Sequence, residues 1–172
     1  EGLPADWLAG HPAGAEGKIA VTSNTPDYLP VMTYAKKSAT REKVWKEYRN
    51  RGYPKNVEVL NNLLARRYEL ATLLGYENWA AFATEDKMAK TARAVGEFIE
   101  KGANAALARA KADMATLLTR KKKDAPKATA VEPWEQDYYE DRVKAEQLGF
   151  DSQVLRDYFE YQSVKDGVMT IT

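Results

Sequence analysis

The chain has 172 residues, of which 44% are hydrophobic and 30% are charged, as in an ordinary globular protein. It contains no cysteine, which excludes a disulfide-stabilised scaffold. Its 26 basic and 25 acidic side chains leave a net charge of +1, so no overall field would attract nucleic acid or an anionic membrane surface.

The first 35 residues are predicted to be mostly irregular. Residues 1–17 are rich in Gly, Ala and Pro, which indicates a loop-rich segment with one short helix around residues 6–9. Residues 18–22 (KIAVT) alternate polar and apolar side chains, the pattern of a short strand. Residues 28–35 (YLPVMTYA) fit either a strand or a short helix, and Pro30 favours a helix with proline in its first turn.

Helical patterns dominate from residue 38 onward. Residues 38–50 place Val44, Trp45 and Tyr48 on one side of a predicted helix. Residues 55–74 form the next helix, whose leucine-rich stripe ends before Gly75, a typical residue for a helix C-terminus.

The following stretch, residues 73–91 (LLGYENWAAFATEDKMAKT), indicates a turn and a short amphipathic helix. We expect its large apolar side chains to be core or lobe-contact residues: Tyr76, Trp79, Phe82 and Met88. The longest predicted helix covers about residues 92–123 and is capped by Thr91. Its middle, GANAALARAKA, is rich in small residues that would let another helix approach closely, so we expect it to lie deep in a bundle or against another domain.

A further helix is predicted over residues 133–149. Asp151 is expected to cap the helix that follows it, and Ser163 with Asp166 resembles a capping box before the last segment.

These patterns predict an all-α fold, a multi-helix bundle-like lobe with one long helix and at most a small strand element near residues 18–22. We expect residues 1–17 to form a loop-rich N-terminal segment and residues 18–172 to form one incomplete domain. The chain begins without Met and stops within an apparently amphipathic helix, so we expect it to be a piece of a longer protein.

The residues themselves indicate no catalytic centre. A catalytic zinc takes three protein ligands, mostly histidines, and this chain has one histidine, His11, which we interpret as a solvated loop residue. A Ser/His/Asp triad would also have to use His11, and the sequence contains neither G-x-S-x-G nor a Gly-rich phosphate loop. The serines stand where caps and turns use a hydroxyl group: Ser23, Ser38, Ser152 and Ser163.

Two charged clusters leave alternatives open. Residues 134–141 combine aromatic rings with four carboxylates, which would suit sugar binding or acid–base chemistry, although the helix dipole favours an acidic first turn in any case. Those carboxylates are Glu135, Asp137, Glu140 and Asp141. The basic residues 120–123 could contact phosphate, but cations also favour the last turn of a helix, and we prefer that interpretation. We interpret the tryptophans as packing residues: Trp7, Trp45, Trp79 and Trp134.

Three stretches carry a resemblance to a known family. They are VTSNTPDYLPVMTYAKKSATREKVWKEYRNRG, NVEVLNNLLARRYELATLLGYENWAAFATEDKMAKT and EPWEQDYYEDRVKAEQLGFDSQVLRDYFEYQSVKDGVM. In collinear order over about residues 18–169, they resemble the thimet oligopeptidase-like zinc metallopeptidases, which include oligopeptidase A and the peptidyl-dipeptidase. Glu135 departs from the Asp that family members commonly have after the tryptophan.

The resemblance implies a largely helical, cytoplasmic protein whose two lobes enclose a channel that admits short peptides. In the full-length parent, an HExxH helix and a downstream Glu hold one zinc ion. None of these residues has a counterpart here, so no catalytic, cofactor-binding or metal-binding residue is carried over, and we expect no cofactor in this chain.

We therefore expect a non-catalytic fragment of a zinc-dependent oligopeptidase that forms helical scaffold and channel wall. Its expected partners are the missing catalytic lobe of the same protein and, in the parent, short peptides, with no nucleic acid and no membrane. Exposed apolar faces would favour self-association. The alternative is a stand-alone helical module that binds peptides or proteins without catalysis.

Overall fold

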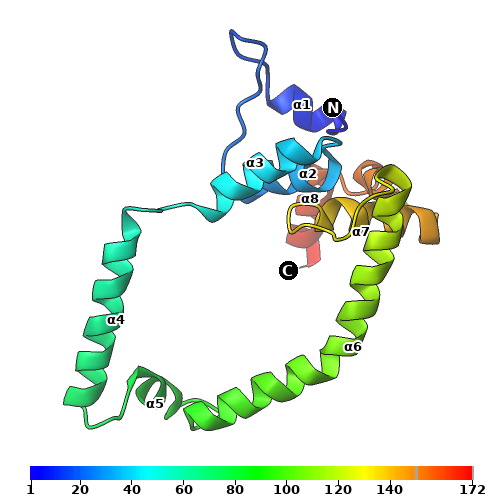
Figure 1. Ribbon diagram of the computed structural model, residues 1–172. Coiled ribbons are helices and arrows are strands. Elements are labelled where there is room, and N and C mark those ends of the chain that lie inside the picture. Colours follow the sequence, from blue (N-terminus) through cyan, green and yellow to red (C-terminus); the bar gives the residue numbers. More distant parts are fainter. Residues whose placement is uncertain (150, 172) are drawn as a thin grey trace. The chain divides into compact units, whose positions relative to one another are not determined.

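The computed structural model describes residues 1–149 and 151–171, and this part of the chain is helical without strands (Figure 1). The helices are α1 (Ala5–Gly10), α2 (Thr25–Tyr34), α3 (Ser38–Arg49), α4 (Asn56–Leu73), α5 (Trp79–Thr84), α6 (Ala92–Asp124), α7 (Gln136–Leu148), the 3₁₀ helix η1 (Ser152–Asp157) and α8 (Tyr161–Ile171). The predicted all-α class is confirmed. Within the described residues, no helix has the length and apolar character that crossing a membrane requires.

The chain folds as two compact units. Unit 1 combines Glu1–Arg49 with Met114–Thr172, and unit 2 consists of Asn50–Asp113. Residues 92–113 of α6 belong to unit 2, and the rest of this helix belongs to unit 1. The division of the chain at residue 17 stays a prediction.

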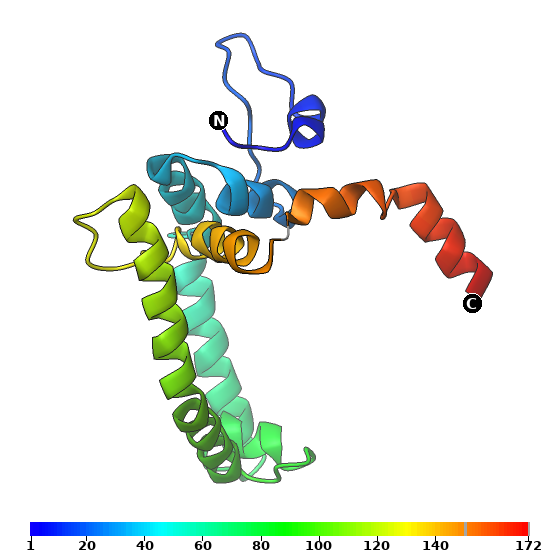
Figure 2. The same cartoon turned by 90° about the vertical axis from the view of Figure 1, so that its right-hand side faces the viewer.

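The core of unit 1 consists of two apolar clusters, and α2 packs against both α3 and α7 (Figure 2). The first cluster has Trp7, Val31 and Ala35 at its centre, and the second has Leu117, Tyr138 and Tyr139. The predicted apolar side of α3 contributes as expected: Val44 packs against the first cluster and Tyr48 stacks on Tyr28, with ring centroids 3.9 Å apart.

The strand predicted for residues 18–22 is wrong, because these residues have no regular secondary structure. Ile19 and Val21 instead pack against the cluster of Trp7, Val31 and Ala35. The alternation of apolar side chains therefore serves packing against helices rather than pairing with another strand.

The proline in the first turn of α2 is Pro26, and Pro30 lies inside the helix rather than at its start. Since proline has no backbone N–H, the carbonyl of Pro26 lacks the helical hydrogen bond that residue 30 would otherwise supply. The helix continues beyond this point, and the N–H of Ala35 donates to the carbonyl of Val31 at 3.1 Å.

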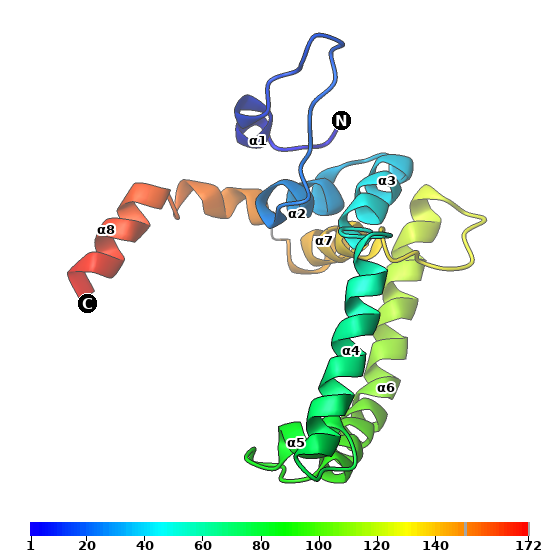
Figure 3. The ribbon, with the colours of Figure 1, turned by 90° about the vertical axis from the view of Figure 1, so that its left-hand side faces the viewer.

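In unit 2, α4 packs against α5 (Figure 3). The side chain of Asn78 accepts from the N–H of Ala81 and caps the start of α5. Gly75 adopts φ 85°, the N–H of Tyr76 donates to the carbonyl of Ala71 and the N–H of Gly75 donates to that of Thr72. This Schellman motif confirms the predicted role of Gly75. Thr91 caps α6 as predicted, since its hydroxyl oxygen accepts from the N–H of Ala94 at 3.1 Å.

Three expectations for the C-terminal third need correction. Helix α7 begins at Gln136, three residues after the predicted start, and Asp151 caps a 3₁₀ helix rather than an α-helix. The capping box at Ser163 is wrong, because α8 already begins at Tyr161. The carboxylate of Glu160 accepts from the N–H groups of residues 162 and 163 and thus caps this helix.

Residues 102–112 of α6, which contain the small side chains, are exposed in the described chain. No other part of the described chain covers these residues, so the predicted position deep in a bundle is not seen within this chain.

Candidate functional site

Arg41 of α3 is the largest fully buried side chain in the described part of the chain, with 1% of its surface exposed. Its Nε donates to the carbonyl of Trp134 at 3.1 Å, and its Nη1 donates to the carbonyls of Ala35 and Lys36. Its guanidinium carbon lies 4.2 Å from the centre of the Tyr138 ring. Burial lowers the pKa of Arg41, yet the three carbonyls and the aromatic face compensate the buried cation.

Glu135 is the buried carboxylate of the same region, with 4% of its surface exposed. It pairs with Lys121 and accepts from the Ser38 hydroxyl and from the N–H of Glu132, each of the latter two at 3.0 Å. The indole N–H of Trp134 donates to the same Ser38 oxygen at 3.2 Å. Burial alone would raise the pKa of Glu135, but the hydrogen bonds from Lys121, Glu132 and Ser38 together lower it.

We call these five residues, Arg41, Glu135, Lys121, Ser38 and Trp134, the buried polar network. It joins the start of α3, the end of α6 and the turn before α7. Each of its charged groups has hydrogen-bond partners within the protein, so none is left as a free base or nucleophile. The network therefore joins three helices of unit 1 through buried hydrogen bonds.

The four carboxylates at the start of α7 do not converge on a site. Glu135 belongs to the buried polar network, whereas Glu140 accepts from the side-chain amide of Gln136 at 2.9 Å. Burial raises the pKa of Asp137, and repulsion from Glu140 raises it further. Neither groove described below is lined by any of the four, which favours the acidic helix turn over a sugar-binding or acid–base site.

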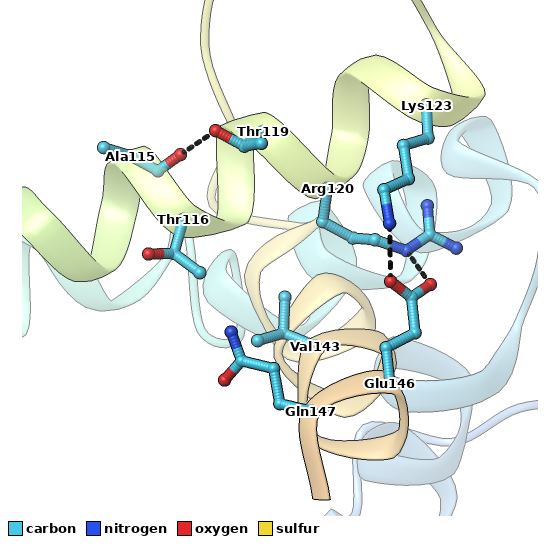
Figure 4. Close-up of a pocket in the computed structure, with 8 residues that line it drawn as sticks. All are labelled: Ala115, Thr116, Thr119, Arg120, Lys123, Val143, Glu146 and Gln147. Atoms are coloured by element: carbon cyan, nitrogen blue, oxygen red, sulfur yellow. Dashed lines mark hydrogen bonds and ion pairs between the residues drawn. The ribbon is translucent and has the colours of Figure 1, made fainter. Parts of the chain in front are cut away.

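The first groove, of about 560 Å³, lies in unit 1 between the end of α6 and α7 (Figure 4). Its polar wall is an ion cluster in which Arg120 and Lys123 both donate to Glu146. Arg120 also pairs with Asp124 at 2.9 Å. The hydrogen bond from Lys123 lowers the pKa of Glu146 most, and the hydrogen bond from Arg120 lowers it further against the opposing effect of burial.

The basic residues 120–123 are thus mostly neutralised by carboxylates of the same chain. Lys121 pairs with Glu135, so Lys122 is the member of this run that makes no ion pair within the described residues. Cations that are already paired are poor phosphate ligands, which favours the helix-end interpretation over a nucleic-acid surface.

The second groove, of about 430 Å³, lies between residues 19–23 and α3. Ile19, Val21 and Val44 supply apolar lining, and Lys43 with Glu47 supplies charge.

His11 is not the solvated loop residue that we predicted. Its side chain is 22% exposed, and its ring stacks on Trp7 with centroids 3.8 Å apart and an interplanar angle of 11°. Nδ1 lies 2.8 Å from the Trp7 carbonyl, and Nε2 lies 3.1 Å from Oδ1 of Asp27. The Thr22 hydroxyl donates to Asp27 and not to His11, so the three side chains do not form a nucleophilic triad.

The donor set in the described chain does not fit zinc. No group of three or more His, Cys, Asp or Glu side chains is arranged to hold a metal ion in this part of the molecule. The single histidine has both ring nitrogens engaged by oxygen atoms.

In unit 2 the motif after α4 builds an aromatic cluster. Phe82 lies 5.3 Å from both Tyr76 and Trp79, measured between ring centroids, and the guanidinium of Arg67 lies 5.2 Å from the Trp79 ring. These three aromatic residues pack on one another and are half-buried, and their predicted role as core or lobe-contact residues stays a prediction. Met88 is 99% exposed, so its predicted place in a core is not realised within this chain.

Comparison of the sequence with known proteins shows to which family the chain is similar. Residues 31–172 match the model of Peptidase family M3. The chain is 31% identical to oligopeptidase A of Escherichia coli and 33% identical to the organellar oligopeptidase A of Arabidopsis thaliana, in each case over 99% of its length. It is 28% identical to saccharolysin of Saccharomyces cerevisiae over 88% of its length.

The matched region is a small part of each relative. It covers 27% of the Escherichia coli protein, 23% of the Arabidopsis protein and 22% of saccharolysin. The chain thus spans about a quarter of the length of the curated relatives it matches.

Proposed function

The chain belongs to peptidase family M3, and we propose from this membership that it is a helical scaffold segment of a zinc-dependent oligopeptidase that carries no catalytic residue itself. The observation that carries the proposal is the match over residues 31–172 in a chain with one histidine and no cysteine. The family resemblance drawn from the sequence is confirmed by this match.

Zinc enters the proposal only as the metal of the full-length parent. Because the described residues offer no ligand set, we assign no catalytic step to this chain. The parent would hydrolyse short peptides, in keeping with the names of its oligopeptidase relatives. The contribution of this segment would be a helical wall of the substrate channel.

The partner of this wall would be the catalytic lobe of the same protein. Support comes from large apolar side chains of α4 that remain exposed: Val57, Leu60, Leu63, Leu64, Leu70 and Leu73. Such a contiguous apolar face is unusual on a monomeric surface, and in the parent it would be covered by further protein. In the isolated chain the same face would favour self-association.

A peptidase assay tests the first part of the proposal. The purified chain, supplied with Zn²⁺ and a quenched fluorescent peptide, is expected to give no cleavage above buffer. Cleavage that a chelator abolishes would contradict the proposal, because it would require a metal centre within these residues.

The second candidate function, a stand-alone module that binds peptides or proteins, is tested by two measurements. Calorimetric titration with short peptides would show no heat of binding for a scaffold segment and saturable heat for a module. Sequencing the source DNA beyond the codon for Thr172 distinguishes them independently. An open reading frame that reaches HExxH supports the scaffold, and an immediate stop codon supports the module.

We place the parent in the cytoplasm. One relative carries an organellar name, so the location is to be tested directly by imaging the tagged full-length parent. A fluorescent signal confined to an organelle would contradict this placement.

A further inference from the structure

Both ring nitrogens of His11 face oxygen atoms that can only accept hydrogen bonds. Nδ1 faces the backbone carbonyl of Trp7 at 2.8 Å, and Nε2 faces the carboxylate of Asp27 at 3.1 Å. A neutral imidazole has one N–H group and would leave a nitrogen lone pair pointing at one of these oxygens. Only the doubly protonated imidazolium satisfies both contacts.

His11 contacts both α1 and α2 of unit 1. It directly follows α1, and its backbone N–H donates to the carbonyl of Leu8 at 3.1 Å. Its ring covers Trp7, which is itself part of the first core cluster. Through Asp27 in the first turn of α2, the same ring connects α1 to the helix beneath it.

Asp27 extends the connection to a third segment. Its Oδ2 accepts from the Thr22 N–H at 3.1 Å and from the Thr22 hydroxyl at 2.5 Å. Thr22 ends the stretch that carries Ile19 and Val21, which pack on the first core cluster and line the second groove. A single carboxylate therefore holds α1, α2 and residues 19–23 together.

We propose that protonated His11 and Asp27 form a pH-dependent latch that fastens α1 and residues 19–23 to the core of unit 1. When His11 loses its proton, one of its two hydrogen bonds is lost together with the charge that pairs with Asp27. The N-terminal segment then loosens, and the apolar surface of α2 and α3 beneath Ile19 and Val21 becomes accessible. The second groove widens as a result.

The electrostatics agree with this geometry. The Trp7 carbonyl has the largest effect on the pKa of His11 and raises it, and Asp27 raises it further against the effect of burial. The hydrogen bond from Thr22 lowers the pKa of Asp27 most, followed by that from His11. On the neighbouring exposed loop, Glu16 and Lys18 pair with each other at 2.6 Å.

The signs define the pH window of the latch. Because the pKa of His11 is raised in the folded state, His11 stabilises the fold fully below its ordinary pKa of 6.5. This stabilisation is lost as the pH rises through the higher pKa of the folded state. Because the pKa of Asp27 is lowered in the folded state, Asp27 stabilises the fold above its ordinary pKa of 3.8. This stabilisation is lost as the pH falls through the lower pKa of the folded state. The latch is therefore strongest between these two ordinary values and opens toward alkaline pH.

The chain offers a direct test because it contains a single histidine. NMR of the complete 172-residue chain would follow the one imidazole signal from pH 4.5 to 8.5, together with hydrogen exchange of the α1 amides. We expect the imidazole to titrate above 6.5, and the α1 amides to lose protection with the same midpoint. The variant Asp27→Asn should shift the imidazole midpoint downward.

Two further variants separate the latch from general effects of pH. His11→Gln cannot titrate and should abolish the pH dependence of the α1 protection factors between pH 5.5 and 8.5, where each exchange rate is divided into the intrinsic base-catalysed rate at the same pH. Glu16→Gln removes an exposed charge of the same N-terminal segment and should leave both midpoints unchanged. An imidazole that titrates at or below 6.5 in the unaltered chain would overturn the proposal, and so would α1 protection factors that keep their pH dependence in His11→Gln.

Discussion

Lys121 near the end of α6 pairs with Glu135 just before α7, and both side chains are withdrawn from solvent, with 12% and 6% of their surfaces exposed. A buried ion pair of this kind stabilises little relative to a well-packed apolar pair, because two charges must leave water. Replacing only one of the two charged residues is strongly destabilising, because the remaining charge stays buried without its partner.

The variant Lys121→Met should therefore lower the free energy of unfolding by about 3–5 kcal/mol. Urea denaturation followed by circular dichroism measures the loss. Lys122→Met is the matched control, because Lys122 is exposed, and its effect should stay within about 0.5 kcal/mol. Equal effects of the two substitutions would show that the pair does not determine the stability of unit 1.

Glu135 also predicts an acid-sensitive stability. Burial opposes ionisation, yet the hydrogen bonds from Lys121, Glu132 and Ser38 hold the pKa of this carboxyl below its ordinary value of 4.5. Because the folded state binds the proton less readily than the unfolded state, the stabilisation is present above pH 4.5 and is lost as the pH falls through the lower folded value.

The measurement compares urea midpoints at pH 7 and at pH 3 for the unaltered chain and for Glu135→Gln. The variant should be less stable at pH 7 and should show a smaller decrease on acidification. An undiminished pH dependence in Glu135→Gln would assign the acid sensitivity to other carboxylates.

Gly75 occupies a left-handed backbone conformation, φ 85°, at the end of α4. Gly75→Ala should destabilise unit 2 by about 1 kcal/mol, because a Cβ atom is disfavoured at positive φ. Gly96 lies inside α6, and a Cβ added there meets no atom within 4 Å, so Gly96→Ala should stabilise by about 0.5–1 kcal/mol. Thermal unfolding monitored by circular dichroism at the helix band gives both values, and the opposite order of the two would contradict the predicted roles.

The exposed apolar face of α4 predicts concentration-dependent self-association of this chain. Leu60 and Leu64 are 53% and 54% exposed, so the double variant Leu60→Gln/Leu64→Gln should shift the population toward monomer. Light scattering coupled to size-exclusion chromatography provides the mass. Leu148→Gln, at a side chain 71% exposed on α7, is the control and should leave the mass unchanged. A chain that is monomeric at all concentrations would contradict the prediction.

Signals that act over a few residues were sufficient to predict much of the fold. The hydroxyl of Thr91 and the missing side chain of Gly75 act on the neighbouring backbone, so their roles as helix caps follow from the sequence alone. The helical periodicity gave the bounds of α3, α4 and α6 to within a residue.

Interactions between distant residues could not be predicted in this way. Arg41 meets the carbonyl of Trp134 across 93 positions of sequence, and Ser38 meets Glu135 across 97. An arginine on a helix is normally solvated, so nothing near Arg41 indicates that it is the largest fully buried side chain of the described chain. His11 was misjudged for the same reason, because its partner Asp27 comes from another helix.

The division of unit 1 into Glu1–Arg49 and a second stretch that begins at Met114 has a consequence for biosynthesis. While the ribosome makes the chain from its N-terminus, α3 emerges long before the turn around Trp134 that accepts from Arg41. During that interval Arg41 lacks the carbonyl of Trp134 as a hydrogen-bond partner, and α2 lacks α7 as a packing partner. Because the entropic cost of closing a loop grows only slowly with its length, the intervening unit 2 delays the completion of unit 1 without preventing it. Translation must therefore pass α7 before the stretch Glu1–Arg49 can reach its final fold.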